Sequence, residues 1–392
     1  MHILFIVNHY PNKDDVHLGV KFRKQIKEYT KSGYRVTIFA CMQHRRGVNK
    51  AKHLWNVISS GRLYEIGEDY GSPIIFDNLS SLFGILKING RLDMLSLNSN
   101  EVKSKFASRL YKIIKNRYSQ PDIIHAHSSH WSGCVAYELY KKTGIPYAVT
   151  ENMTIFQRNL VKKKDFPIIK EVFKNASYVF TVSESTGKVL EEQFGEIVKP
   201  WTEIPNMLDK EEFAPPGHRP KNKNEFTFFS ISRLAPVKRF DILLNAFARN
   251  FKNMENVTLR IGGFGPEESS LKNLAKELCI EHKVTFLGPL DRGSVKTEMR
   301  NCDAYVMSSE HETFGIPLLE AGFCGKPAVA TKCGGPETIV TKKTGILVPV
   351  NDIDALGEAM TNIYSTIDKY DPAEIRNYYV DNYSTEAVIK RL

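Results

Sequence analysis

The chain has 392 residues, of which 42% are hydrophobic and 25% charged, a composition typical of a globular protein. At about 100–200 residues per domain, this length predicts two domains that each bury a core. The formal net charge of +10 is unevenly divided: residues 1–200 carry 30 basic and 18 acidic side chains, whereas residues 201–392 carry 24 and 26. We therefore expect an anionic partner at the N-terminal half.

Several protein classes are excluded by this composition. No run approaches the roughly 18 consecutive apolar residues of a membrane span, and the opening run 3–7 is too short for the core of a signal peptide. The six cysteines are scattered without a C-x-x-C pair, which excludes the usual zinc spacing and disfavours a disulfide scaffold. Ordinary Gly, Pro and aromatic contents exclude collagen-like, disordered and coiled-coil chains. A reducing cytoplasm is the compartment that we expect.

In the N-terminal half, short runs rich in β-branched residues alternate with amphipathic segments. The expected strands are 3–7, 35–40, 122–125, 147–150 and 178–182, and the expected helices are 20–31, 102–118 and 132–142. This alternation predicts βαβ units around a parallel sheet. Between residues 44 and 100 the pattern is weakest; residues 82–88 fit a core helix or hairpin better than an amphipathic helix that touches acceptor or membrane.

The C-terminal half repeats the pattern and predicts a second doubly wound unit. Its expected strands are 226–231, 257–261, 284–287, 304–307 and 328–330, and its expected helices are 240–250, 267–279, 316–324 and 353–364. A Pro-rich polar stretch, 205–224, separates the halves and is typical of an interdomain linker. Ligands of open α/β sheets bind beyond the carboxyl ends of the strands, so we looked for chemistry in the segments that follow strands.

The segment 310–320 follows an expected strand and combines acidic residues with Gly and Pro. Gly315 permits a close backbone approach, Pro317 suits the first turn of a helix, and the N–H groups of such a helix start can bind phosphate. Glu320 lies in an apolar run, where an unpaired carboxylate is costly. We therefore favour ligand binding by Glu312 and Glu320 over a solvated loop with a surface carboxylate.

The basic loop 232–239 also follows an expected strand. Arg233 and Lys238 lie five residues apart at the opening of a helix, where they can hold a diphosphate from two sides. Basic residues at a helix N-terminus oppose the macrodipole, and this cost favours an anionic ligand over an ordinary basic helix start. Lys238 is preferred to Arg239 because of the resemblance given below.

Two histidines end an expected strand of the N-terminal half. Alternation places His125 and His127 on the same side of an ideal strand, but we expect the chain to turn after Ala126, so that His127 faces the cleft. A histidine at a strand end is by itself more often a packing residue, and the resemblance reverses that preference.

These segments resemble, in order and over nearly the whole chain, the motifs of the retaining GT-B glycosyltransferases of family 4. Residues 312–320 match E-x-F-G-x-x-x-x-E, Arg233 with Lys238 matches R-x-x-x-x-K, and 125–128 matches the H-A-H segment. Residues 204–209 resemble I-P-N-G-V-D with Met in place of Gly, 262–267 resemble G-x-G-P-E, and 334–337 match G-G-x-x-E. Residues 10–25 are most similar to members that build bacterial surface polysaccharides, with Gly19 alone where the family has two glycines.

The resemblance implies an α/β fold with two Rossmann-like doubly wound parallel-sheet domains facing a cleft. Residues 1–204 would form the acceptor domain, 205–374 the nucleotide-sugar donor domain, and 375–392 a helix that packs back on the N-terminal domain.

The resemblance also implies roles for individual residues. Arg233 and Lys238 would neutralise the donor diphosphate as it leaves, assisted by the backbone N–H groups of Phe314, Gly315 and Ile316. Glu320 would hold the ribose hydroxyls, Glu312 the hydroxyls of the donor sugar, and His127 would lie beside the transferred sugar. The remaining expected donor-site residues lie in loops: Gly19, Gly263, Leu287 and Gly288. The family's front-face reaction needs no protein general base, although Glu151 is an acceptor-facing candidate.

The expected activity is that of a hexosyl- or N-acetylhexosaminyltransferase. It would move a sugar from a nucleotide diphosphate donor, UDP-linked in our interpretation, to a lipid-linked saccharide in bacterial surface polysaccharide synthesis. The enzyme would be cytoplasmic and peripheral on the inner, anionic face of the cell membrane. Two alternatives stay open: a UDP-sugar 2-epimerase of the same fold and a non-catalytic GT-B scaffold, although a scaffold need not keep both Glu and both basic residues.

Other patterns are interpreted as structural or are absent. The D-x-D sequence at Asp352 precedes an apolar helical pattern, so we expect a helix N-cap rather than a metal site, and no required divalent ion. The chain has no P-loop, and its first βα turn lacks G-x-G-x-x-G, which disfavours a nicotinamide oxidoreductase. The run 162–164 is a lipid-binding site or a solvated loop. No nucleic-acid-binding motif accompanies the basic half, so nucleic acid is not an expected partner.

Overall fold

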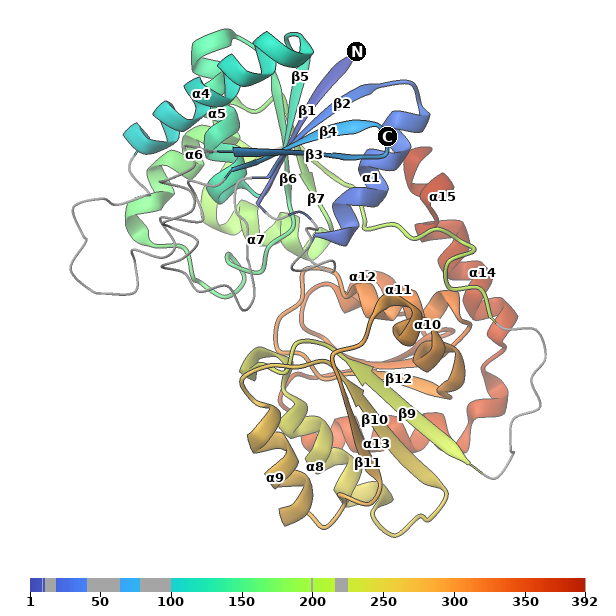
Figure 1. Ribbon diagram of the computed structural model, residues 1–392. Coiled ribbons are helices and arrows are strands. Elements are labelled where there is room, and N and C mark those ends of the chain that lie inside the picture. Colours follow the sequence, from blue (N-terminus) through green and yellow to red (C-terminus); the bar gives the residue numbers. More distant parts are fainter. Residues whose placement is uncertain are drawn as a thin grey trace. The chain divides into compact units, whose positions relative to one another are not determined.

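The computed structural model describes residues 1–8, 10, 19–40, 64–77, 100–198, 200–215 and 225–391. The chain divides into two compact units (Figure 1). Unit 1 comprises Met1–Val182 and Gly187–Glu203, and unit 2 comprises Ser183–Thr186 and Ile204–Leu392. The segment 82–88 and residues 216–224 of the expected linker lie outside the described residues.

Unit 1 is built on an eight-stranded sheet with the order β3-β4-β2-β1-β5-β6-β7-β8. All its strand pairs are parallel except the β3–β4 hairpin. The strands are β1 (His2–Val7), β2 (Arg35–Ala40), β3 (Tyr64–Asp69), β4 (Ser72–Asp77), β5 (Ile123–His127), β6 (Tyr147–Glu151), β7 (Tyr178–Thr181) and β8 (Trp201–Glu203). The helices are α1 (Val20–Lys31), α4 (Asn100–Tyr118), α5 (Cys134–Thr143), α6 (Phe166–Asn175) and α7 (Glu184–Phe194).

The strand period of two divides the core of unit 1 between the faces of the sheet. Along β1, Leu4 and Ile6 belong to a core that also takes in residues of α4, α5, α6 and α7. Phe5 and Val7 point the other way, into a core shared with α1. A strand buried on both faces has a continuous apolar sequence, which is what residues 3–7 show.

Unit 2 is built on a six-stranded, fully parallel sheet with the order β11-β10-β9-β12-β13-β14. Its strands are β9 (Phe226–Ile231), β10 (Val257–Gly262), β11 (Val284–Gly288), β12 (Ala304–Met307), β13 (Ala328–Thr331) and β14 (Gly345–Val348). Its helices are α8 (Phe240–Phe251), α9 (Glu268–Glu277), α10 (Arg292–Asn301), α11 (Ile316–Phe323), α12 (Pro336–Ile339), α13 (Ile353–Ser365), α14 (Pro372–Tyr383) and α15 (Thr385–Ile389).

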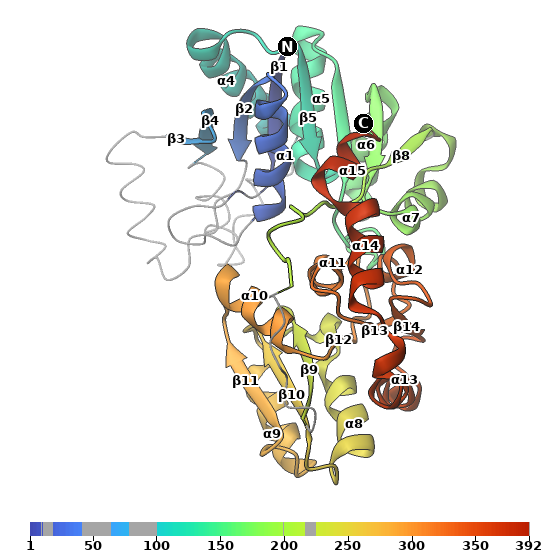
Figure 2. The ribbon, with the colours of Figure 1, turned by 90° about the vertical axis from the view of Figure 1, so that its right-hand side faces the viewer.

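The C-terminal helices α14 and α15 belong to unit 2. Helix α14 lies beside α11 (Figure 2). Gly322 of α11 has no side chain, and a Cβ there would lie 2.2 Å from the ring of Tyr379 of α14, so these two helices pack closely. That residues 375–392 also pack on the N-terminal domain stays a prediction.

Each sheet has a point at which the strand order reverses. In unit 1 the chain moves outward from β1 in one direction and from β5 in the other, and in unit 2 the same holds for β9 and β12. In open α/β sheets, ligands bind beyond the carboxyl ends of the strands at such switch points. The segments after β1, β5, β9 and β12 are therefore the places to look for function.

The expectation of two doubly wound parallel sheets is confirmed, and every strand and helix named from the sequence lies within a few residues of an observed one. The β3–β4 hairpin was not predicted; its turn residues Tyr70 and Gly71 both have positive φ. Two such central residues are typical of tight hairpin turns. Short or amphipathic elements were not predicted either, among them α6, α7, α10 and β14, and the single helix expected over 375–392 is divided into α14 and α15. None of the described helices is both long and apolar enough to cross a membrane.

Candidate functional site

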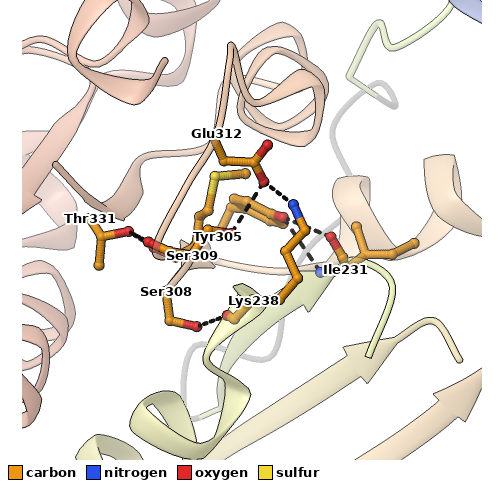
Figure 3. A network of polar contacts seen from close by, with 8 residues as sticks. Ile231, Lys238, Tyr305, Ser308, Ser309, Glu312 and Thr331 are labelled. Carbon is orange, nitrogen blue, oxygen red and sulfur yellow. Dashed lines mark hydrogen bonds and ion pairs between the residues drawn. The ribbon is translucent and has the colours of Figure 1, made fainter. Parts of the chain in front are cut away.

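The switch point of unit 2 holds an ion pair between two residues singled out from the sequence. Lys238 ends the short turn after β9, and Glu312 lies in the loop after β12; Lys238 Nζ donates to Glu312 Oε1 (Figure 3). Both side chains are mostly buried, at 19% and 15% exposure. The pairing is local to adjacent strands, so the fold of unit 2 alone brings these residues together.

Hydrogen bonds fix the backbone around this ion pair. Ser308 Oγ donates to the carbonyl oxygen of Lys238 at 2.9 Å, and Ser309 Oγ donates to Glu312 Oε1 at 3.2 Å (Figure 3). The buried hydroxyl of Tyr305 donates to the carbonyl oxygen of Ile231 at 3.1 Å, which joins β12 to the end of β9. The charged groups are therefore carried by a rigid support.

Arg233 differs from its neighbours in the same loop. It is exposed, and no hydrogen bond or ion pair joins its guanidinium to another residue in the described part of the chain. Arg239, by contrast, makes a bidentate ion pair with Asp241, at 3.0 and 2.9 Å. Of these two arginines, the structure leaves Arg233 available for an anion.

Glycines allow the loop after β10 to lie against the loop after β9. A Cβ on Gly263 would lie 1.8 Å from the carbonyl oxygen of Ser232, and one on Gly265 would lie 2.1 Å from that of Leu234. Gly263 also has a φ of 119°, and its N–H donates to Gly288 O at 2.8 Å. The expected loop residues Gly263, Leu287 and Gly288 are thus brought together at the strand ends of unit 2.

The start of α11 presents backbone donors beside Glu312. Gly315 adopts φ 100° and is followed by Ile316 and Pro317 in the first turn. The N–H groups of Phe314, Gly315 and Ile316 donate to no other residue that the structure describes. Unsatisfied N–H groups at a helix N-terminus favour an anion, as the sequence predicted for this segment.

Glu320 is buried, with a side chain only 5% exposed, and its partner was missed in the sequence. Arg292, the first residue of α10, donates Nη1 to Glu320 Oε1 and Nε to Glu212 Oε1, the latter at 2.7 Å. The interpretation of Glu320 as a solvated surface carboxylate is excluded. The signal that could have revealed its partner was the need of a carboxylate in an apolar run for a cation.

His127 of unit 1 is only 4% exposed. Its ring packs against those of Phe5 and Phe22, with centroids 4.6 and 4.8 Å away, and Asn152 Nδ2 lies 3.1 Å from His127 Nδ1. The expected turn after Ala126 is wrong, because β5 continues through His127, which pairs in register with Thr150. His125 and His127 therefore stack on one face of the sheet, with centroids 4.6 Å apart, and the role of His127 beside a sugar stays a prediction.

His125 is fully buried and belongs to a hydrogen-bonded chain. Gln25 Nε2 donates to Tyr29 Oη at 2.9 Å, and that oxygen lies 3.2 Å from His125 Nδ1, while His125 Nε2 lies 2.7 Å from Thr150 Oγ1. Burial lowers the pKa of His125 to about 4. His125 is thus a neutral packing residue at physiological pH.

Glu151 is buried at the end of β6 and accepts four hydrogen bonds. Oε2 accepts from the N–H and the hydroxyl of Ser129, at 2.9 and 2.6 Å, and Oε1 accepts from the N–H groups of Asn152 and Met153, both at 3.0 Å. These bonds fasten the wide turn Ser129–Gly133 to the end of the neighbouring strand. The geometry gives Glu151 a structural role.

Two further expectations concern helix starts. Asp352 is confirmed as an N-cap: its side chain accepts from the N–H of Ala355 at 2.9 Å. Gly19 is the residue before α1 and adopts a left-handed conformation with φ 73°, which glycine adopts without strain. Across the described ranges, no group of three His, Cys, Asp or Glu side chains is placed to hold a metal ion.

Each half of the chain matches the model of a known protein family. The model of "Glycosyltransferase Family 4" matches residues 23–212, and that of "Glycosyl transferases group 1" matches residues 214–377.

Curated relatives match about half of the chain. An exopolysaccharide phosphotransferase of Streptomyces coelicolor is 33% identical over 200 residues, 50% of this chain and 20% of that protein. A phosphatidylinositol N-acetylglucosaminyltransferase component of Arabidopsis thaliana is 30% identical over 189 residues, 48% of this chain and 42% of that protein. The chain thus spans less than half the length of either relative.

The fold is shared with a solved structure over nearly its full length. The sucrose-phosphate synthase of Thermosynechococcus elongatus superposes with a TM-score of 0.78 at 19% identity, covering 100% of this chain and 96% of that one. The likeness shows that both proteins have the same two-unit architecture.

Proposed function

Because the chain belongs to the family 4 glycosyltransferases and has their GT-B fold, we propose that it moves a sugar from a nucleotide diphosphate donor to a saccharide acceptor. The observation that carries this proposal is the switch point of unit 2, where Lys238 and Glu312 meet beside the N–H groups that open α11. A cation, a carboxylate and helix N–H groups together suit a ligand that has both phosphates and sugar hydroxyls.

In this proposal the basic groups act on the leaving diphosphate. Negative charge builds on the diphosphate as the bond to the sugar breaks, and a fixed ammonium in a partly buried site stabilises that charge more strongly than one in water. Lys238 is held at such a place, and Arg233 supplies a second, exposed cation. The N–H groups of Phe314, Gly315 and Ile316 add donors at fixed positions.

The carboxylates are proposed to bind hydroxyls. Glu312, held by Lys238 and Ser309, would accept from the donor sugar, and Glu320 would accept from the ribose. Charge-assisted hydrogen bonds of this kind are stronger than neutral ones and fix orientation. With the diphosphate neutralised by side chains and N–H groups, we propose transfer with retention of configuration, without a required divalent ion and without a protein general base.

The donor proposed is UDP-linked and the acceptor is a lipid-linked saccharide of a bacterial surface polysaccharide. The excess of basic residues in positions 1–200, 30 against 18 acidic ones, supports an anionic acceptor or membrane surface on that side. A relative whose name includes phosphatidylinositol is consistent with a phosphate-bearing lipid. The expected result is salt-sensitive binding to vesicles of anionic lipid; binding that ignores ionic strength would contradict the membrane part.

A panel of nucleotide diphosphate sugars, read by thermal shift and then by product analysis with lipid-linked saccharides, tests the donor and acceptor together. We expect one UDP-sugar to raise the unfolding temperature most and to give a glycosylated lipid. Release of UDP without any acceptor would favour the 2-epimerase, and binding of no donor would favour a scaffold.

A parallel measurement concerns the site. Near-normal donor turnover in both Lys238→Ala and Glu320→Ala would contradict the assignment of the site. A large activity loss in Glu312→Ala with an unchanged unfolding temperature would support it, whereas an equal loss of stability would point to a structural role.

A further inference from the structure

Arg292 lies at the start of α10, outside every motif identified in the sequence, yet it contacts the buried carboxylate of Glu320. Glu320 is the residue that the proposed function assigns to the ribose hydroxyls, and a role for Arg292 toward it rests on that function. A buried carboxylate stays ionised and oriented only when a cation or several donors hold it. Arg292 supplies that cation from a neighbouring helix.

The guanidinium of Arg292 is fixed by three different contacts. Its Nη1 donates to Glu320, its Nε donates to Glu212 Oε1 at 2.7 Å, and its Cζ lies over the ring of Phe213, 4.5 Å from the ring centroid. Burial of Arg292 disfavours its charged form, but the two carboxylates outweigh this, so that the pKa of Arg292 is raised. The guanidinium is therefore always charged and has one orientation.

Glu212 and Phe213 belong to the segment that enters unit 2, and this segment is itself fastened there. Arg300 Nε donates to Ala214 O at 2.9 Å, and Arg376 Nη2 donates to Lys210 O at 2.7 Å. Leu208 N–H donates to Tyr383 O at 3.0 Å. Arg292 thus links an anchored segment to the side chain of Glu320.

We propose that Arg292, held by Glu212 and Phe213, is a positioning residue that keeps Glu320 ionised and aimed for the two ribose hydroxyls of the donor. It touches no reacting atom in this account and acts through Glu320. Lysine cannot replace it, because a single ammonium does not supply an Nε edge, an Nη edge and a stacking plane at once. Arg292→Lys should therefore lose ribose recognition while keeping the positive charge.

The test compares UDP with 2′,3′-dideoxy-UDP, by calorimetric titration of the full chain. In the wild type we expect the dideoxy compound to bind at least about tenfold more weakly, because hydrogen bonds from the ribose hydroxyls to a carboxylate are lost. In Arg292→Lys we expect the two compounds to bind within about twofold of each other, with most of the affinity for the diphosphate retained. In Glu212→Gln we expect the ratio of the two affinities to lie between those of the wild type and Arg292→Lys.

Arg260→Lys is the matched control. Arg260 pairs with Glu298 of α10 at 2.7 and 2.8 Å, and the side chains are 35% and 16% exposed, close to the 33% and 19% of Arg292 and Glu212. Arg260→Lys should change stability as much as Arg292→Lys does. It should leave the ratio of the affinities for UDP and dideoxy-UDP at the wild-type value. Thermal unfolding of each variant checks that it is folded. If Arg292→Lys does not fold, Arg292→Gln takes its place in the titrations.

The outcomes separate the positioning role from the function on which it rests. A wild-type protein that binds no UDP overturns both the proposed donor and the role of Arg292. A wild type that discriminates between the compounds, with an Arg292→Lys variant that discriminates equally, overturns the positioning role alone. Equal loss of the ratio in the Arg260→Lys control overturns it too, because the effect would then follow from stability.

Discussion

The two switch points have the same topology but hold different chemistry. At the end of β5 in unit 1, His127 packs against the rings of Phe5 and Phe22, and His125 is buried and neutral at physiological pH. At the end of β9 and β12 in unit 2, Lys238 and Glu312 form an ion pair beside α11. The strand order therefore predicts where a ligand can bind, and the side chains at that place determine whether it can bind a charged ligand.

The difference predicts a division of labour. Glu151 and His125, at the switch point of unit 1, should chiefly affect stability, because their polar groups are hydrogen-bonded within the unit. Residues at the switch point of unit 2 should chiefly affect nucleotide binding and turnover. In the proposed function their cations attract the diphosphate, and their carboxylates accept hydrogen bonds from sugar hydroxyls.

Lys238→Ala should cause the largest loss of activity. A small loss would contradict the different roles that we assign to the two switch points. Removal of one preorganised charge from a developing anion costs about 100–1,000-fold in kcat, so we expect a loss of that size in transfer from the best UDP-sugar. Lys272→Ala is the control, because Lys272 pairs with Glu268 on the exposed side of α9. Equal activity in the two variants would contradict the role of Lys238.

Gly263→Ala tests the loops of unit 2, because it disturbs their packing without removing a charge. With φ 119° and a Cβ position 1.8 Å from Ser232 O, alanine forces the two loops apart, and we expect about 3 kcal/mol of lost stability together with weaker UDP binding. Gly293→Ala is matched, because the nearest atom to its Cβ lies 3.5 Å away. Denaturant unfolding and calorimetry measure both effects; unchanged values for Gly263→Ala would refute the loop packing.

Glu151→Ala tests the structural side of the comparison. Loss of the carboxylate leaves the buried N–H and hydroxyl of Ser129 and the partly buried N–H groups of Asn152 and Met153 without their acceptor, and we expect a loss of about 3 kcal/mol in unfolding free energy. Affinity for UDP should stay at the wild-type value. Glu138→Ala, which removes a buried glutamate with an ion pair to the half-exposed Lys141, should cost about 1 kcal/mol or less. A large loss of UDP affinity in Glu151→Ala would show that this switch point also serves the donor.

The pH dependence of His125 gives the smallest effect. Its pKa is about 4 in the folded state and about 6.5 in an unfolded chain, so between these values the unfolded state binds more protons. Stability should therefore fall as pH falls from about 6.5, by about 2 kcal/mol at pH 5. Unfolding free energies at pH 7 and pH 5 check this, and His125→Gln should show a decrease smaller by that amount; parallel slopes would contradict a neutral, buried His125.

The sequence predicted most of the fold because strands buried on both faces leave short, largely apolar runs, as in 226–231 and 304–307. It missed β3 and β4, since one hairpin at a sheet edge leaves little apolar pattern, and it missed α10, whose exposed face is strongly polar. Glu312 and Lys238 were singled out because their segments follow expected strands and match the family's motifs, whereas the glycine loops were implied by the resemblance alone.

Other parts of the site depend on contacts that spacing does not encode. Arg292 reaches Glu320 and Glu212 across 28 and 80 residues of sequence, so no local pattern marks it. The turn expected after Ala126 was wrong because strand pairing with β6, and not the local sequence, extends β5 to His127.

The central claim, that the donor nucleotide binds at the switch point of unit 2, is tested most directly by hydrogen exchange of the full chain with and without UDP. The account predicts that UDP slows exchange chiefly in peptides covering 232–239, 263–267 and 312–320, with Lys238→Ala abolishing most of that protection at the same UDP concentration. Protection concentrated in peptides covering 123–133, with none in the three segments of unit 2, would contradict it.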